Sequence, residues 1–252
     1  MNNKCLASIV QLALFTVSFQ SAAFQKNEYN PIVFNFAQLY DFNPVKGNIK
    51  ELNTFVYNED ETINYQSALK VGRDGCVDSF TMKQKKDEYL NSIANWLSVK
   101  REKNKLVGSD ANGPVEMEVA ENCLIISRTD SNGKLIYQYN NDGIIIGSMS
   151  AEPKVQYSEN TYNENNLPET IKYYKDNVVF SESIISYGKD ITKPFDLQME
   201  IKALGLPILV VDSKCDYDEQ NIAHKCNFIL TIVSNGKTIK LPKRSITETV
   251  FY

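Results

Sequence analysis

Short alternating segments separated by Asn-, Asp- and Gly-rich turns run along most of this chain, and they constrain its fold more than any other feature. Asn132-Gly133 and Asp142-Gly143 are two such turns. Both dipeptides tolerate the positive φ angles that two-residue hairpin loops require. The segments between turns are rich in Val, Ile, Thr and aromatic residues, which favour strands. The pattern therefore predicts an all-β fold, mainly an antiparallel meander of hairpins.

The expected strands share two properties: they alternate in polarity, and a turn signal bounds each of them. We expect them at residues 50–57, 63–71, 76–82, 124–128, 134–139, 144–150, 155–162, 169–174, 178–187, 198–203, 207–212, 215–217, 226–234 and 237–241.

One stretch departs from this pattern. The charged residues of 83–105 are mainly basic, and Tyr89, Ile93 and Trp96-Leu97 lie at helical spacing. This predicts one short helix near residues 86–97. Its basic ends are read as a solvated face rather than a membrane-binding surface, because apolar residues are few and acids interrupt the pattern. The following residues, 103–120, contain Gly, Asn and Pro and are predicted to form a mobile loop.

The first 23 residues predict export. Lys4 precedes an apolar run from Leu6 to Phe19, and Ser21-Ala22-Ala23 places small residues before Phe24. This is the arrangement of a secretory signal peptide cleaved before Phe24, and the run is shorter than the roughly 20 residues of a membrane-spanning helix. We therefore expect a signal peptide at residues 1–23 and a single antiparallel β domain at residues 24–252, in the periplasm or secreted.

The charge balance excludes one class of partner. Cleavage removes one lysine and no acidic residue, which takes the formal charge from −4 to −5. Nucleic-acid binding needs a basic face, so no nucleic-acid partner is expected. The overall charge also provides no attraction to anionic lipid.

The cysteines of the exported part predict two disulfides. Cys5 lies in the signal peptide, and the even number that remains, Cys76, Cys123, Cys215 and Cys226, is typical of paired cysteines in an exported chain. A two-residue loop at Gln220-Asn221 would place Cys215 opposite Cys226 in an antiparallel pair, although a bulged turn would shift that register by one residue.

The second pair, Cys76 and Cys123, follows by elimination. It would close a longer loop and contribute about 3–4 kcal/mol in the chain-entropy model. A zinc site is the weaker interpretation, because the chain has no CxxC motif and a single histidine, His224.

The search for catalytic and metal-binding motifs assigns no catalytic, cofactor-binding or metal-binding residue and predicts no cofactor. Nucleophile elbow, P-loop, dinucleotide and HExxH motifs are missing from the sequence. His224 is interpreted as an exposed cross-strand neighbour of Tyr217. Asp216, Asp218 and Glu219 lack the Gly-then-Glu pattern of a calcium loop and are interpreted as an ordinary acidic turn.

Three functional hypotheses follow. The first is a non-catalytic β-sheet module of the cell envelope, binding or structural, whose partner is an unidentified envelope protein or glycan. The tyrosine-rich strands favour it, because tyrosine suits interfaces. The second is a carboxylate-dependent envelope hydrolase, which would need a deep cleft with two convergent acids within about 10 Å. The third is a lipid carrier, which would need a continuous apolar interior in a half-open barrel.

Several sequence blocks resemble the YnfC-like family of uncharacterised enterobacterial envelope lipoproteins. They are Asp41-Phe42-Asn43-Pro44-Val45-Lys46-Gly47, Gly75-Cys76-Val77-Asp78-Ser79, Cys215-Asp216-Tyr217-Asp218 and Phe251-Tyr252. The four cysteines fall where that family keeps its own. The resemblance implies an envelope location and no established enzymatic activity.

The chain departs from that family at its anchor. Family members carry a lipidated cysteine at the end of the signal sequence, whereas Cys5 precedes the apolar run and no cysteine follows Ala23 directly. Membrane anchoring is therefore not expected, and a lipid-anchored location at the cell membrane remains only the alternative.

Overall fold

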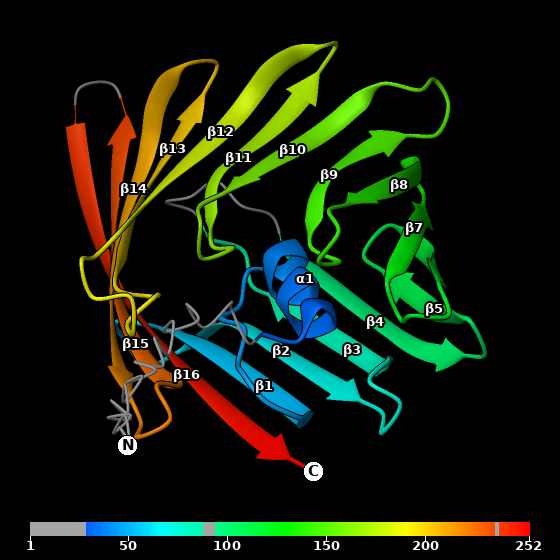
Figure 1. The fold of residues 1–252 in the computed structure, drawn as a ribbon. Helices are drawn as coiled ribbons and strands as arrows, with labels where there is room; N and C mark the ends of the chain where they lie inside the picture. The colour runs from blue at the N-terminus through cyan, green and yellow to red at the C-terminus, as the bar shows by residue number, and fades with distance from the viewer. Residues whose placement is uncertain (1–28, 88–93, 235–236) are drawn as a thin grey trace, which may run out of the picture.

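The chain folds into a closed antiparallel β-barrel with one helix inside it (Figure 1). The computed structural model describes residues 29–87, 94–234 and 237–252. Within these residues the barrel has sixteen strands, each paired with its neighbours in sequence, and β1 pairs with β16 to close the ring. The prediction of an all-β fold built from antiparallel hairpins is confirmed.

The strands are β1 (Ile49–Asn58), β2 (Ile63–Val71), β3 (Val77–Gln84), β4 (Asn95–Glu102), β5 (Lys105–Asp110), β6 (Gly113–Val119), β7 (Ile125–Asp130), β8 (Gly133–Tyr139), β9 (Ile145–Ser150), β10 (Gln156–Tyr162), β11 (Pro168–Lys175), β12 (Val178–Tyr187), β13 (Leu197–Ala203), β14 (Leu206–Tyr217), β15 (Ala223–Ser234) and β16 (Lys237–Phe251).

Helix α1 (Pro31–Tyr40) lies in the lumen and fills one side of it (Figure 1). The side chain of Asn30 accepts a hydrogen bond from the Ile32 amide at 2.8 Å, and Pro31 occupies the first turn; both features favour a helix start. The helix buries residues around most of its circumference, as expected of a helix enclosed by other elements.

The inner face of β1–β6 forms the main core against α1. Leu52, Leu69, Phe80, Leu106 and Met117 project from these strands and are almost fully buried. They pack with the apolar residues of α1 and of the segment that follows it. On this side of the barrel, therefore, α1 fills much of the lumen.

A repeated tyrosine-and-turn arrangement closes one end of the barrel, which we call the plugged end: the turns that follow even-numbered strands. Tyr139, Tyr162 and Tyr217 end strands there. The next residue in each case accepts two backbone hydrogen bonds through its side chain, as Asn140 does from Asp142 and Ile144. Tyrosine therefore ends the strand and Asn or Asp caps the turn.

The same tyrosines also tie one hairpin to the previous one. The Tyr139 hydroxyl donates to the carbonyl of Ile125, and the Tyr162 hydroxyl donates to the carbonyl of Ile145. Tyr187 donates to the Pro168 carbonyl at 2.7 Å in the same way, although a longer turn follows it. The plugged end is thus cross-linked by hydrogen bonds between successive hairpins.

Both disulfides of the sequence analysis are present, and both lie at the plugged end. Cys215 and Cys226 face each other across β14 and β15 with Cα atoms 4.0 Å apart. The register shift in this hairpin falls beyond the cysteines, between Asp216 and Tyr217, so it leaves them opposite. Cys76 bonds Cys123 with a Cα separation of 4.8 Å and joins the turn before β3 to the turn before β7.

Two expectations for the middle of the chain were incorrect. The helix near 86–97 falls partly on residues 88–93, outside the described residues, but its last positions begin β4. There Trp96 is exposed and Leu97 is buried, which is the two-residue alternation of a strand.

The predicted loop at 103–120 contains β5 and β6 instead. Its glycines have structural roles. A Cβ on Gly108 would lie 1.8 Å from the Ser98 carbonyl oxygen, so only glycine permits this close approach of β4 and β5, and Gly113 has a φ of +136° in the turn before β6.

Among the described residues, no helix has the length and apolar character needed to cross a membrane.

The core contact between α1 and β3 generates a first prediction. Phe80→Ala should lower the free energy of unfolding by about 3–5 kcal/mol, because the side chain is fully buried among Phe36, Tyr40 and Phe42. Thr81→Ala, on the exposed side of the same strand, should change it by less than about 0.5 kcal/mol. Urea unfolding followed by circular dichroism measures both, and equal effects would contradict the packing described.

Candidate ligand-binding lumen

Two cavities flank the C-terminal end of α1 inside the barrel. Their volumes are about 550 and 680 Å³, and Leu39, Tyr40, Arg128 and Asn132 border both. Ligand sites in proteins typically measure about 300–1,000 Å³. The end of α1 therefore forms the floor of a lumen that opens at the other end of the barrel, which we call the open end: the turns that follow odd-numbered strands.

The wall of the lumen opposite the β1–β6 core is apolar and is not covered by α1. Val211, Phe228 and Leu230 border the first cavity and Ile171 borders the second. Strand pairing places further apolar residues on the same face, and all members of this wall are only half-buried. The apolar wall comprises Ile171, Ile185, Met199, Ile201, Leu209, Val211, Phe228, Leu230, Ile232 and Leu241.

The outer face of the same strands is largely polar. Lys172 and Glu182 form an ion pair at 3.7 Å between β11 and β12. Gln198 donates to Asp212 at 2.8 Å between β13 and β14. Outward-facing apolar residues are found on β12, as with Ile184, and on β14 and β15, as with Ile229. Elsewhere on this wall the alternation along each strand sends apolar side chains inward and polar ones outward.

The apolar wall contains the long strands β14 and β15, which are twice the length of the short strands β5, β7 and β9, and we also call it the tall wall. Strands β14 and β15 have 12 residues each, whereas β5, β7 and β9 have 6. At about 3.3 Å per residue these lengths are roughly 40 and 20 Å. The long strands extend beyond α1 toward the open end (Figure 1), so part of their inner face has no opposing sheet.

A compact polar cluster lies on the floor of the lumen. Arg128 donates from Nη2 to Asp110 at 3.0 Å and from Nε to Asp130 at 2.9 Å, and its Nη1 lies 3.5 Å from the Tyr40 hydroxyl. Burial raises the pKa of Tyr40 to about 12, despite the opposing effect of Arg128, so its hydroxyl is neutral at pH 7. One cation thus holds two carboxylates beside a neutral hydroxyl.

A second buried ion pair lies next to the first cavity, which Lys243 and Asn64 border. Lys243 donates to Asp87 at 2.6 Å and to the side-chain oxygen of Asn64 at 3.2 Å. Such buried charges are tolerated because they are paired and hydrogen-bonded.

These polar groups do not form a recognisable catalytic arrangement. The convergent acids Asp110 and Asp130 both accept hydrogen bonds from Arg128, so neither is placed as a free nucleophile or as a proton donor to a substrate. Within the described residues, no group of three or more His, Cys, Asp or Glu side chains is arranged to hold a metal ion.

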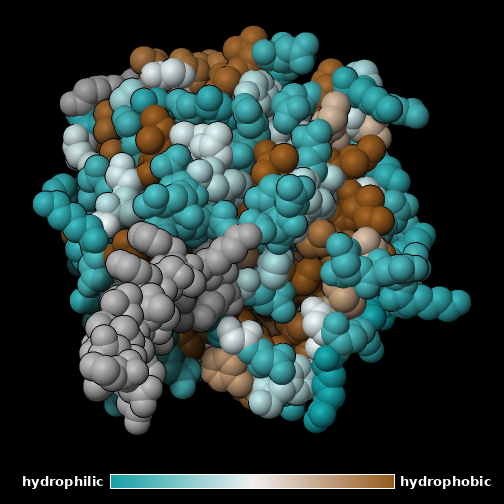
Figure 2. Space-filling view, in the orientation of Figure 1, coloured by the Kyte–Doolittle hydropathy of each residue, from teal (hydrophilic) through white to brown (hydrophobic). Residues whose placement is uncertain are grey.

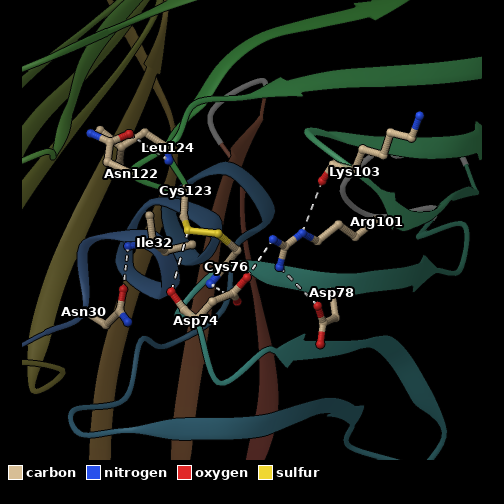
Figure 3. The surroundings of a disulfide bond; sticks show 10 residues. All are labelled: Asn30, Ile32, Asp74, Cys76, Asp78, Arg101, Lys103, Asn122, Cys123 and Leu124. Atoms are coloured by element: carbon tan, nitrogen blue, oxygen red, sulfur yellow. Dashed lines mark hydrogen bonds and ion pairs between the residues drawn. A yellow bond between two sulfur atoms is a disulfide. The ribbon is translucent and has the colours of Figure 1, made fainter.

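The four cysteines lie apart from the lumen cavities. Figure 3 shows Cys76–Cys123 beside Asp74, whose carboxylate accepts from the Cys76 amide at 3.1 Å and pairs with Arg101 at 2.6 Å. Arg101 also contacts Asp78 at 3.4 Å. This network joins the turn before β3 to β4. The disulfide therefore helps to hold the turns of the plugged end together.

The remaining candidates of the sequence analysis also lie outside the lumen cavities. His224 is exposed on β15, as expected, and it lies at the register shift of this hairpin, next to Ala223, the residue that pairs with Tyr217. Asp218 accepts from the amides of Gln220 and Ile222, which is the geometry of an Asx turn.

The lipid-carrier hypothesis requires an apolar interior, but no residues are assigned to it from the sequence. A signal for it exists: residues 206–211 and 228–233 are apolar at nearly every position instead of alternating. Such runs indicate strands that are apolar on both faces.

Comparison with known proteins places the chain in context. It matches an uncharacterised protein family (UPF0257) over residues 3–251. No curated protein matches it. A porin-like protein from Bacteroides uniformis is similar over 80% of this chain and 98% of that chain, with a TM-score of 0.39 and 10% identity.

A second solved structure, MucB in complex with MucA(peri), is similar over 79% of this chain and 88% of that chain, with a TM-score of 0.14 and 9% identity. Neither similarity is high enough to carry a statement about this chain's activity.

The cluster on the floor generates a second prediction. Arg128→Leu should destabilise the protein by about 3–5 kcal/mol, because two largely buried carboxylates lose their shared cation. Arg128→Lys should recover part of that loss, since it keeps the charge but not the forked geometry. Thermal unfolding compares the three proteins, and an unchanged Arg128→Leu variant would contradict the pairing.

Proposed function

We propose that this chain, which belongs to the uncharacterised family UPF0257, is an envelope binding protein whose lumen holds the acyl chain of a lipid. The proposal keeps the expectation of a non-catalytic envelope module. It takes up the third hypothesis, a lipid carrier, in which an apolar ligand inside the barrel stands in place of an external protein or glycan partner.

The observation that carries the proposal is the uncovered apolar wall. Residues such as Ile201, Leu209 and Leu230 face a lumen in which no described protein segment buries them fully. On the opposite wall, equivalent residues such as Leu52 and Leu69 are buried by α1 and its neighbours. Apolar surface left in water is unfavourable by about 25 cal/mol per Å², so an apolar ligand would stabilise this wall.

The direction in which apolar and polar side chains point supports a carrier rather than a barrel embedded in lipid. Barrels that span membranes place apolar residues outward and polar residues inward. On β11 and β13 the order is reversed, because Lys172 and Gln198 point outward while Ile171 and Met199 point inward. Strand β12 is mixed on its outer face, where Ile184 lies beside Glu182, but its Ile185 points inward.

The dimensions of the lumen favour a slender ligand. Cavities of about 550 and 680 Å³ meet at Leu39 and Tyr40, and the apolar wall continues from there toward the open end. Each methylene of an acyl chain buried there contributes about 0.8 kcal/mol before the cost of association is subtracted. The polar floor around Arg128 lies beside this path.

The envelope location is supported by features of different kinds. The N-terminal residues have the pattern of an export signal, and both disulfides require an oxidising compartment to form.

The experiment uses a fluorescent fatty acid and two adjacent isoleucines on β12. Ile185 faces the lumen and Ile184 faces outward, and both are half-buried. The unmodified chain should bind the probe saturably, with one or a few molecules per chain. Ile185→Glu should raise the Kd by about tenfold or more, because a charge would face the apolar path.

The matched control is Ile184→Glu, which should leave the Kd unchanged. Circular dichroism verifies that both variants remain folded. An absence of saturable binding, or equal effects of the two substitutions, would overturn the lumen as the ligand site.

A further inference from the structure

The open end of the barrel carries exposed apolar residues on the hairpins of the tall wall. In the β13–β14 hairpin, Leu204 is 67% exposed and Leu206 is 70% exposed. Val178 and Phe180 of the adjacent β11–β12 hairpin are exposed as well, and the Leu204 amide bonds the Phe180 carbonyl. Figure 2 shows apolar residues gathered along the upper edge of the molecule, over the β13–β14 hairpin.

The backbone conformation of Leu204 is one that leucine rarely adopts. Leu204 has a φ of 49° and Gly205 a φ of 79°, the left-handed conformation in which Gly, Asn and Asp are favoured. The neighbouring β11–β12 turn uses Asp176 and Asn177 at φ values of 52° and 61°. Leucine at position 204 is therefore unfavourable both for the conformation of the turn and for exposure to water. Neither the turn nor contact with solvent explains why a leucine occupies this position.

The apolar surface continues down both faces of the hairpins next to this tip. Ile208 and Val233 are exposed on the outer face of β14 and β15. On the inner face, Leu209 and Ile232 lead into the apolar wall. A hairpin that is apolar on both faces is more stable when apolar groups, rather than water, surround it.

Several other described turns at the open end are polar. Residues 58–62 form an Asn-, Glu- and Asp-rich turn, and Asp110 and Asp130 each cap a turn by accepting a backbone bond, from Asn112 and Asn132. The apolar tips of the β11–β12 and β13–β14 hairpins thus lie on the wall that also has the apolar inner face, while outside that wall Val155 is exposed in the turn before β10.

Basic residues flank the apolar tips. Lys175, Lys237 and Lys240 are exposed beside them, against the single acidic Asp176 in the same turns. The region is locally positive although the chain as a whole is acidic. Apolar side chains bordered by lysines match the surface of a bilayer that contains anionic lipids.

We propose that the apolar rim, defined as Val178, Phe180, Leu204, Leu206, Ile208 and Val233, inserts into the surface of an anionic lipid bilayer. The inserted rim connects the bilayer with the apolar wall, so that an acyl chain passes into the lumen without crossing water. The transfer of an acyl chain into the lumen rests on the proposed function, whereas insertion of the rim into a bilayer is measured independently.

The experiment measures co-sedimentation of the full mature chain with vesicles of phosphatidylcholine and phosphatidylglycerol. The test variant combines Leu204→Asn with Leu206→Thr. Asparagine suits the left-handed turn better than leucine, so this variant should fold at least as stably. Its partition onto vesicles should fall about tenfold or more relative to the unmodified chain.

The matched control is Ile191→Asn, which removes an isoleucine of equal exposure, 67%, at the plugged end. It should leave vesicle binding unchanged. A charge test, Lys237→Glu with Lys240→Glu, should weaken binding to anionic vesicles and leave the weaker binding to neutral vesicles unchanged.

Two results would overturn the rim as a membrane contact. One is a chain that does not bind vesicles at all, as expected if the rim docks on a protein. The other is equal behaviour of the Leu204→Asn, Leu206→Thr variant and the Ile191→Asn control. Binding of the fluorescent fatty acid in vesicle-free solution should be unaffected by the rim variant, which separates failure of this proposal from failure of the lumen site.

Discussion

A closed barrel of sixteen strands encloses more space than its own side chains can fill, and the rest of the structure depends on how that space is occupied. Helix α1 fills the side lined by β1–β6, where Phe36 and Tyr40 pack against Phe80. The side lined by β11–β16 has no such filling and keeps apolar residues at the lumen surface. The asymmetry of the lumen thus follows from the placement of one ten-residue helix.

The two ends of the barrel have different chemistry. At the plugged end, tyrosine hydroxyls, Asx turns and both disulfides tie successive hairpins together. At the open end, the hairpins of the tall wall carry apolar tips such as Leu204 and Leu206. A rigid closed end holds α1 in place, and an open end with apolar tips leaves a path to the lumen. This division supports a protein that takes up an apolar molecule through one end.

The sequence predicts the strands well because turn chemistry is local, but it does not reveal what lies inside the barrel. The Gly, Asn and Pro content of residues 103–120 predicts a loop, whereas Gly108 allows a close approach of two strands and Gly113 begins β6 with a positive φ. Asn30-Pro31 is a standard helix start, but its signal is short and isolated in a β-rich sequence. The lumen depends on the pairing of β1 with β16, whose residues lie at opposite ends of the chain. Alternation alone does not distinguish a barrel from an open sheet, so inward and outward faces became clear only from the closed structure.

The most direct test of the account asks which face of the tall wall contacts the ligand. A fatty acid with a nitroxide on its chain would be added to protein carrying labelled Ile, Leu and Val methyl groups, and signal broadening would be recorded by NMR. The account predicts strong broadening at the lumen-facing Ile201, Leu209 and Leu230, and little at the outward-facing Ile184 and Ile229. Broadening confined to the outward-facing methyl groups, or none at either face, would contradict it.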